Sequence, residues 1–124
     1  MDETARLRVQ VVHLRRRRRF LEEKLLKPSL MIAGSLSRTF LRCGKRSCIC
    51  KKREHPGHGP YWAMNLVMGE GKIKKVYLKK NADIRAAQAY RRYQRILASY
   101  RQVIKEIDGV FNRLRELFCY QPGE

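Results

Sequence analysis

Three of the chain's four cysteines lie within eight residues, at the start of the stretch CGKRSCICKKREHPGHGPYW that begins at residue 43. Cys43, Cys48 and Cys50 offer three sulfur ligands, and histidines follow at positions 55 and 58. Structural zinc sites take four tetrahedral ligands, commonly thiolates and imidazoles. The surrounding lysines and arginines lower thiol pKa values and so favour the thiolate form that a metal binds. This spacing predicts a bound metal, with zinc as the expected ion.

The fourth ligand stays open at this point among His58, His55 and Cys119. We favour His58, because glycines flank it and Gly59-Pro60 then turns the chain into the next predicted strand. That arrangement puts the imidazole at the exit of the loop, opposite the cysteines at its entrance. Two alternatives are a set of reduced, unligated thiols and an iron–sulfur cluster, although such a cluster normally takes four cysteines. A structural metal is expected, because a catalytic zinc needs an open position and a nearby acid or base.

Residues 2–27 are predicted to form one helix that Pro28 ends. Asp2 or Thr4 is a suitable N-terminal cap. The apolar positions follow alternating steps of four and three, which is a seven-residue repeat with one basic member. These positions are Leu7, Val11, Leu14, Arg18, Leu21 and Leu25.

Residues 82–118 are predicted to form a longer helix with Asn81 as its cap. Its apolar positions repeat in the same way for more than four heptads, which indicates a coiled coil. These positions are Ala86, Tyr90, Tyr93, Leu97, Tyr100, Ile104, Ile107, Phe111, Leu114 and Phe118. The second helix is too long to be packed by the first alone, so the rest of it must pack on the middle segment, on a second copy or on another molecule. We expect a homodimer or a protein partner along residues 97–118.

Residues 29–80 change character and are predicted to form a three-stranded antiparallel sheet. Residues 30–42 are expected to form one strand. Residues 61–68 alternate, with Trp62, Met64, Leu66 and Met68 facing one way. Gly69-Glu70-Gly71 is the predicted turn into a return strand. The cysteine loop would then lie between the first and second strands.

The expected fold is therefore α+β: a small three-stranded antiparallel sheet with a metal-binding loop, flanked by two long helices that form an antiparallel coiled-coil stalk. We divide the chain into a basic N-terminal helix (residues 1–27), a zinc-binding β head (28–80) and a long C-terminal helix (81–124), within one domain overall. A head of about 50 residues is small enough that such domains often need a metal or a disulfide.

The chain of 124 residues carries 29 basic and 11 acidic residues, a formal net charge of +18. A folded domain with that charge usually binds a polyanion, and nucleic acid is the first candidate. Residues 29–80 hold 12 basic and 2 acidic residues, so 10 of the 18 net charges lie there. The candidate nucleic-acid contacts are Lys45, Arg46, Lys51, Lys52 and Arg53 around the metal loop, Lys72, Lys74, Lys75 and Lys79 on the hairpin, Arg91, Arg92 and Arg95 on the second helix, and Arg15, Arg16, Arg17 and Arg19 on the first.

The hairpin of residues 61–79 has the shape of a two-stranded ribbon that fits the DNA major groove. Tyr61 and Tyr77 are alternatively suited to stack on unpaired bases. The arginine run at residues 15–19 is also compatible with a solvated face or with a contact to an acidic partner.

Four short runs in this sequence resemble a family of short bacterial and archaeal proteins classed as a domain of unknown function. They are GSLS at residue 34, CGKRSCIC at 43, HGPYW at 58 and VYLK at 76, and the resemblance covers roughly residues 31–100. It supports the fold and the ligand set Cys43, Cys48, Cys50 and His58. It implies no activity, but genes of the family often lie near transposase and other mobile-element genes, which suggests work on DNA.

We therefore expect a nucleic-acid-binding accessory protein, associated with a mobile element or a ribonucleoprotein. The alternative is a coiled-coil scaffold subunit whose charge serves an acidic partner. We expect no enzyme and no small-molecule substrate, because no recognisable carboxylate cluster, phosphate-binding loop or nucleophile–base pair is present. No stretch reaches the roughly 20 apolar residues of a membrane span. A cytoplasmic location, at the nucleoid or on a ribonucleoprotein, is expected, with the thiols reduced.

Overall fold

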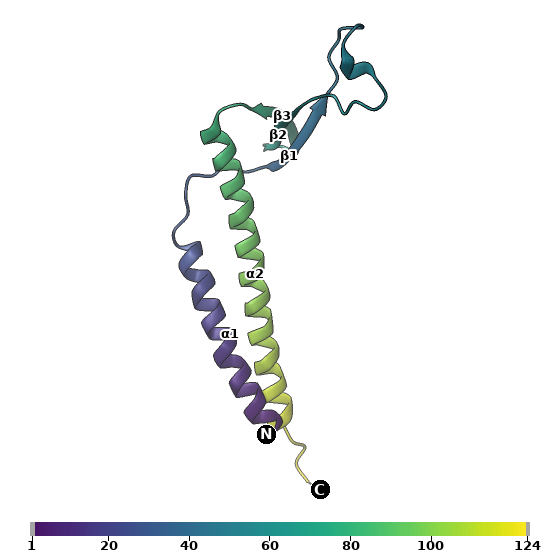
Figure 1. The fold of residues 1–124 in the computed structure, drawn as a ribbon. Helices are drawn as coiled ribbons and strands as arrows, with labels where there is room; N and C mark the ends of the chain where they lie inside the picture. The colour runs from purple at the N-terminus through teal and green to yellow at the C-terminus, as the bar shows by residue number, and fades with distance from the viewer. Residues whose placement is uncertain (1, 124) are drawn as a thin grey trace. The chain divides into compact units, whose positions relative to one another are not determined.

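The computed structural model describes residues 2–123 and contains two long helices and one sheet (Figure 1). The elements run α1 (Glu3–Leu25), β1 (Ser35–Leu41), a short 3-10 helix η1 (Ile49–Lys51), β2 (His58–Met68), β3 (Lys72–Leu78) and α2 (Asn81–Phe118). The α+β class with a three-stranded antiparallel sheet is thereby confirmed. The chain forms two compact units. The helical unit comprises the residues up to Pro28 and from Tyr93 onward, and the sheet unit comprises Ser29–Arg92.

In the helical unit α1 and the later part of α2 run antiparallel. At one end the Arg113 guanidinium pairs with the Glu3 carboxylate, with Nε 2.6 Å from Oε1. At the other end the Tyr93 hydroxyl donates a 3.0 Å hydrogen bond to the Leu25 carbonyl. The Asp2 carboxylate caps α1 by accepting from the Ala5 N–H at 2.7 Å. These contacts fix the direction of the pair and stabilise both ends of α1.

The apolar repeat predicted for α1 faces the interior of this unit. Val11 and Leu21 are buried, and the other positions of the repeat, Arg18 included, are partly buried. Arg18 forms an ion pair with Glu22, which lies one turn further along α1. The distance from Arg18 Nε to Glu22 Oε1 is 3.3 Å, but the contact lacks hydrogen-bond geometry. The basic member of the repeat is thus neutralised locally rather than by α2.

The repeat predicted for α2 is partly wrong. Tyr100 packs against the core and Ile107 is part of it, but the positions between them differ. Val103 and Val110 are buried where Ile104 and Phe111 were expected, and the latter two are 38% and 48% exposed. Val103 with Val110 and Ile104 with Phe111 are two rows of apolar residues on α2. Either row forms a heptad pattern together with residues 100 and 107. The row with the smaller β-branched valines is the one that faces the core.

The sheet unit has the strand order β1-β2-β3. In its centre Met64 of β2 lies between Leu36 of β1 and Val76 of β3, and a register shift interrupts β1 between Thr39 and Leu41. The predicted turn of residues 69–71 is present, with positive φ at Glu70 and Gly71. Neither helix has an apolar stretch long enough to cross a membrane within the part of the chain that the structure describes.

The two faces of the sheet differ in burial. Alternate residues of β2 form the inner face, where Met64 is fully buried and Trp62 and Leu66 are partly buried. Met68 shares this face by alternation but is 45% exposed near the turn. The segment before β1 is tied to α2 by a hydrogen bond from the Ile32 N–H to the Ala86 carbonyl, 3.1 Å long. The opposite face, which we call the open face, carries Tyr61 and Tyr77.

Candidate metal centre

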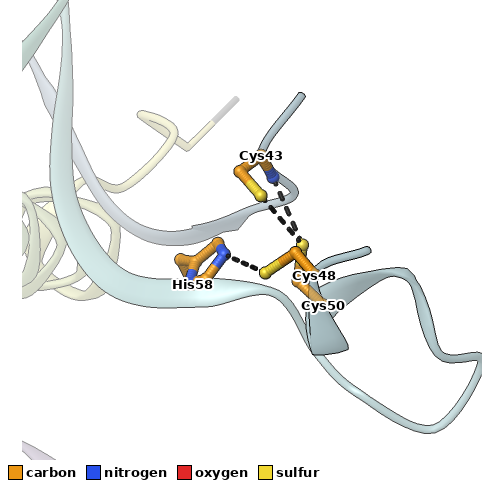
Figure 2. A group of neighbouring side chains, drawn as sticks. All are labelled: Cys43, Cys48, Cys50 and His58. Atoms are coloured by element: carbon orange, nitrogen blue, oxygen red, sulfur yellow. Dashed lines mark hydrogen bonds between the residues drawn. The ribbon is translucent and has the colours of Figure 1, made fainter. Parts of the chain in front are cut away.

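Cys43, Cys48, Cys50 and His58 converge on one point of the sheet unit (Figure 2). Their potential ligand atoms all lie within 4.8 Å of one another. The Cys43 and Cys50 sulfurs are 3.5 Å apart, and the Cys48 sulfur lies 3.2 Å from Nε2 of His58. Two sulfurs bound to one zinc at about 2.3 Å lie about 3.8 Å apart in a tetrahedron. The observed set therefore has the size and chemistry of a Cys₃His metal site.

The strands and η1 bring these four residues together. Leu41 at the end of β1 pairs with His58 at the start of β2, so the chain leaves and re-enters the sheet at adjacent points. We call residues 43–58 the metal loop; it projects beyond these strand ends (Figure 1). Cys43 follows β1, and Cys50 lies in η1, where its side chain is fully buried. Cys48 precedes η1 and its carbonyl accepts the Lys51 N–H at 3.1 Å.

Two glycines allow the end of the metal loop to lie against β1. Gly57 and Gly59 adopt positive φ values of 106° and 125°, which residues with a Cβ rarely adopt. A Cβ at residue 57 would lie 2.9 Å from the Leu41 carbonyl oxygen, and one at residue 59 would lie 2.9 Å from that of Thr39. The Gly59-Pro60 peptide is cis. The glycines that flank His58 thus set the position of its imidazole beside the cysteines.

The other candidate ligands have different surroundings. Nδ1 of His55 accepts a 3.0 Å hydrogen bond from the Gly57 N–H, so this imidazole supports the turn that leads to His58. Its ring centroid is 6.3 Å from that of His58. Cys119 follows the end of α2 and is exposed. Among the described residues, the cluster that could hold a metal ion contains His58 and not His55.

The pKa values of two thiols in the cluster are shifted in opposite directions. Hydrogen bonding from the Lys45 backbone, then from His58, Cys48 and Cys50, lowers the pKa of Cys43 to about 6. The Cys50 backbone lowers the pKa of Cys48, but the Cys43 and Cys50 side chains outweigh it and leave that pKa raised. A second thiolate is disfavoured beside the first because like charges repel. A divalent cation would remove this conflict, since metal binding deprotonates its thiol ligands.

Arg42 is a functional candidate that the sequence analysis missed. Its guanidinium donates to the backbone carbonyls of Cys50, Lys52 and His55, at 3.3 Å for Lys52 and 2.9 Å for His55. One side chain therefore holds carbonyls from three places along the metal loop. Its position directly before Cys43 was the only available signal, and a basic residue in a basic segment does not stand out.

The candidate nucleic-acid contacts are all exposed and are divided between the two units. The sheet unit holds the five cations of the metal loop, Lys72, Lys74 and Lys75 on β3, Lys79 just after it, and Arg91 and Arg92 on α2. The helical unit holds Arg95 and the α1 residues Arg15, Arg16, Arg17 and Arg19.

Within the sheet unit the basic residues lie along the whole length of the sheet, with Lys74 and Lys75 opposite Leu66 and Asn65 of β2. β2 starts at the metal loop and ends at the turn before Lys72. Its 11 residues span about 35 Å at about 3.3 Å per residue. The five loop cations lie at one end of this length and Lys72 at the other. The charge of the expected head is thus spread along the sheet instead of forming one patch.

Comparison with protein families identifies a match over most of the chain. The model of a family described as "Domain of unknown function (DUF6788)" matches residues 12–88, which include the metal loop and the whole sheet. No curated protein and no solved structure matches the chain.

Proposed function

The chain belongs to the DUF6788 family, whose description assigns no activity, and from its own residues we propose that it is a nucleic-acid-binding protein whose metal loop is shaped by a structural zinc ion. The proposal rests on the basic residues that surround the Cys₃His cluster. Five exposed cations lie on the loop that the cluster closes: Lys45, Arg46, Lys51, Lys52 and Arg53. A metal that fixes this loop also fixes its cations, and fixed charges lose less entropy when they bind phosphates.

The donor set supports zinc in a structural role. Three thiolates and one imidazole fill a tetrahedral zinc and leave no open position for a substrate or a water. The only acidic side chains between residues 29 and 80 are Glu54 and Glu70. Glu54 lies in the metal loop but outside the Cys₃His cluster, and Glu70 lies in the hairpin turn at the other end of the sheet. A hydrolytic zinc would need an acid or base beside it. We therefore propose no enzymatic activity for this site.

We further propose that the antiparallel pair of α1 and α2 packs as a coiled coil. Support comes from the burial of Val11, Leu21, Val103, Ile107 and Val110 at heptad-related positions. In this interpretation the protein binds nucleic acid as part of a mobile element or a ribonucleoprotein.

The alternative function is a scaffold subunit that docks through α2. The observation that favours it is an apolar row at seven-residue spacing, whose members Ile104, Phe111 and Phe118 are 38%, 48% and 68% exposed. Binding through such a row depends weakly on salt, because it rests on apolar burial. Binding to phosphates falls steeply between 50 and 200 mM salt.

Two triple variants and a salt titration test the proposal. Labelled single-stranded and duplex oligonucleotides are titrated with wild-type protein, with Lys72, Lys74 and Lys75 changed to Ala, and with Arg15, Arg16 and Arg17 changed to Ala. The lysine variant should lose more affinity, because its residues lie on the sheet rather than on a helix with one side covered. Its salt slope on duplex should fall by about 2–3 units if two or three of the lysines contact phosphates.

The contrary results identify the alternatives. Loss of binding in the arginine variant alone would show that α1 binds the nucleic acid. Affinity that barely changes between 50 and 200 mM salt, or no binding by wild-type protein, would contradict a phosphate-based function and favour the scaffold. Extraction and sequencing of nucleic acid that copurifies with the protein would separate DNA from RNA.

A further inference from the structure

The open face of the sheet carries two aromatic side chains that are partly exposed, Tyr61 and Tyr77. Tyr61 pairs with Thr39, and Ala63, two residues along β2, pairs with Tyr77. Directly paired residues share a face in an antiparallel sheet, and so do residues two apart along a strand. Tyr61 and Tyr77 are therefore diagonal neighbours on one face, about 7–8 Å apart at their Cα atoms.

Both rings are accessible to a ligand. Tyr61 is 44% exposed and Tyr77 is 43% exposed, whereas Ala63 between them is 1% exposed. The rings, and not the strand beneath them, thus meet solvent at this point. The Tyr61 ring leans over Gly59, where a Cβ would lie 3.1 Å from Cδ2 of the ring. The same face continues toward the turn with Val67 and Ile73, which are 76% and 69% exposed.

The polar side chains on this face suit the edges of bases and a phosphate backbone. Ser35 pairs with Asn65, Asn65 pairs with Lys75, and Ser37 pairs with Ala63, so three small polar residues and one cation share the face with the tyrosines. All four are exposed, and the Lys75 ammonium lies 5.6 Å from the centre of the Tyr77 ring. None of the three strands contains an Asp or a Glu.

We propose that the open face binds single-stranded nucleic acid, with unpaired bases stacked on Tyr61 and Tyr77. This inference rests on the proposed function and names its substrate class. Exposed aromatic rings on a basic surface bind unpaired bases by stacking, which every base allows. The bases of a duplex are already stacked on one another and do not offer their faces. The strand would run along the sheet, whose two ends carry the loop cations and Lys72.

Charge is the reason to choose a nucleic acid over a protein as the occupant. The sheet unit holds 15 basic and 3 acidic residues, so a second copy of it would meet strong repulsion. A single strand would instead supply a negative charge at each nucleotide and an apolar base for each ring. A length of about 35 Å along β2 suits a strand of several nucleotides, within the roughly 4–16 nucleotides typical of sheet-based single-strand sites.

Three probes of equal length test the inference on zinc-loaded, full-length protein. They are a 12-nucleotide thymidine strand, the same sugar–phosphate backbone without bases, and a 12-base-pair duplex, with a uridine 12-mer to compare RNA with DNA. Wild-type protein should bind the thymidine strand at least about tenfold more tightly than the baseless strand. Tyr61→Leu and Tyr77→Leu should each remove about fivefold or more of that preference and leave the baseless strand unaffected. Tyr61→Phe and Tyr77→Phe should retain it.

Tyr120→Leu is the matched control, because Tyr120 is 86% exposed and lies beyond α2. It should change none of the affinities. A second measurement does not depend on folding of variants: a strand containing 5-iodouracil, irradiated with wild-type protein, should crosslink to peptides that contain Tyr61 or Tyr77. Crosslinks only to other peptides would overturn the proposal.

The outcomes separate this inference from the proposed function. If no probe binds, the proposed function itself fails. If wild-type protein binds all probes equally and the leucine variants match it, the protein binds phosphates but the stacking site is wrong. If the leucine variants change sedimentation of the free protein and not its affinity for the thymidine strand, the open face contacts a second copy and the inference is overturned.

Discussion

The sulfur of Cys48 lies 3.2 Å from Nε2 of His58, although the two residues are ten positions apart in the sequence. The contact joins the residue before η1 to the first residue of β2. The metal loop is therefore closed on the strand that forms the centre of the sheet. A metal held by these residues would couple the loop to β2, so its loss should loosen both.

Replacement of His58 tests the identity of the fourth ligand. His58→Ala should reduce bound zinc well below one equivalent per chain, whereas His58→Cys should retain it because a thiolate replaces the imidazole. His55→Ala is the matched control, since His55 accepts a hydrogen bond from Gly57 and lies outside the cluster. Elemental analysis of protein purified without chelator gives the metal content. Zinc loss in His55→Ala with full zinc in His58→Ala would reverse the assignment.

Arg42 should control how long the loop holds its metal. Arg42→Ala removes donors to three loop carbonyls, so zinc transfer to a chromogenic chelator should accelerate by about tenfold or more, as expected for loss of one or two hydrogen bonds from a charged group. Arg42→Lys should restore little, because an ammonium lacks the planar fork of donors. Arg46→Ala, an exposed arginine of the same loop, is the control. Equal transfer rates in all of these proteins would show that Arg42 does not support the site.

Cys43 should be reactive at unusually low pH in the metal-free protein. Its pKa is lowered to about 6, first by hydrogen bonding from the Lys45 backbone, so the thiolate predominates above that pH and the thiol below it. Its contribution to the stability of the metal-free fold is present at high pH and is lost as the pH falls through about 6. Mass spectrometry of iodoacetamide labelling should therefore show a half-maximal rate at Cys43 near pH 6. Zinc should protect it, and labelling of the exposed Cys119 gives the internal reference.

The apolar row of α2 should mediate self-association. Ile104 and Phe111 are partly exposed beside the buried valines at 103 and 110. Ile104→Lys and Phe111→Lys should each shift sedimentation from dimer to monomer at micromolar concentration, because a buried unpaired charge opposes association. Gln102→Lys adds the same charge to an exposed position of the same helix and should leave the dimer intact. A stable wild-type monomer at high concentration, with no partner recovered, would contradict self-association.

The sequence predicted the elements well because each follows a simple local rule. The α1 repeat and the 69–71 turn lie where periodicity and turn chemistry put them, whereas α1 ends at Leu25, before the predicted stop at Pro28. The cluster of Cys43, Cys48, Cys50 and His58 was also predictable, since ligand type and loop length limit the choices. The assignment of residues 30–42 to a strand was too long, and β1 covers only Ser35–Leu41.

Other features depend on tertiary choices that one sequence does not contain. Two neighbouring apolar rows on α2 satisfy the same heptad rule, so the burial of Val103 and Val110 instead of Ile104 and Phe111 was not predictable from spacing. The role of Arg42 depends on three backbone carbonyls, which have no side-chain signature. The common face of Tyr61 and Tyr77 depends on the register of β2 with β3.

The proposal that zinc shapes a basic surface for nucleic acid can be tested by a comparison of zinc-loaded and zinc-free protein. Fluorescence anisotropy of a labelled 12-nucleotide strand is measured from 50 to 200 mM salt with zinc-loaded protein and with protein stripped of zinc. We expect the loaded protein to bind more tightly, with a steeper salt slope, because zinc holds the loop cations in place. Identical affinity and slope with and without zinc, or no binding by the loaded protein, would contradict it.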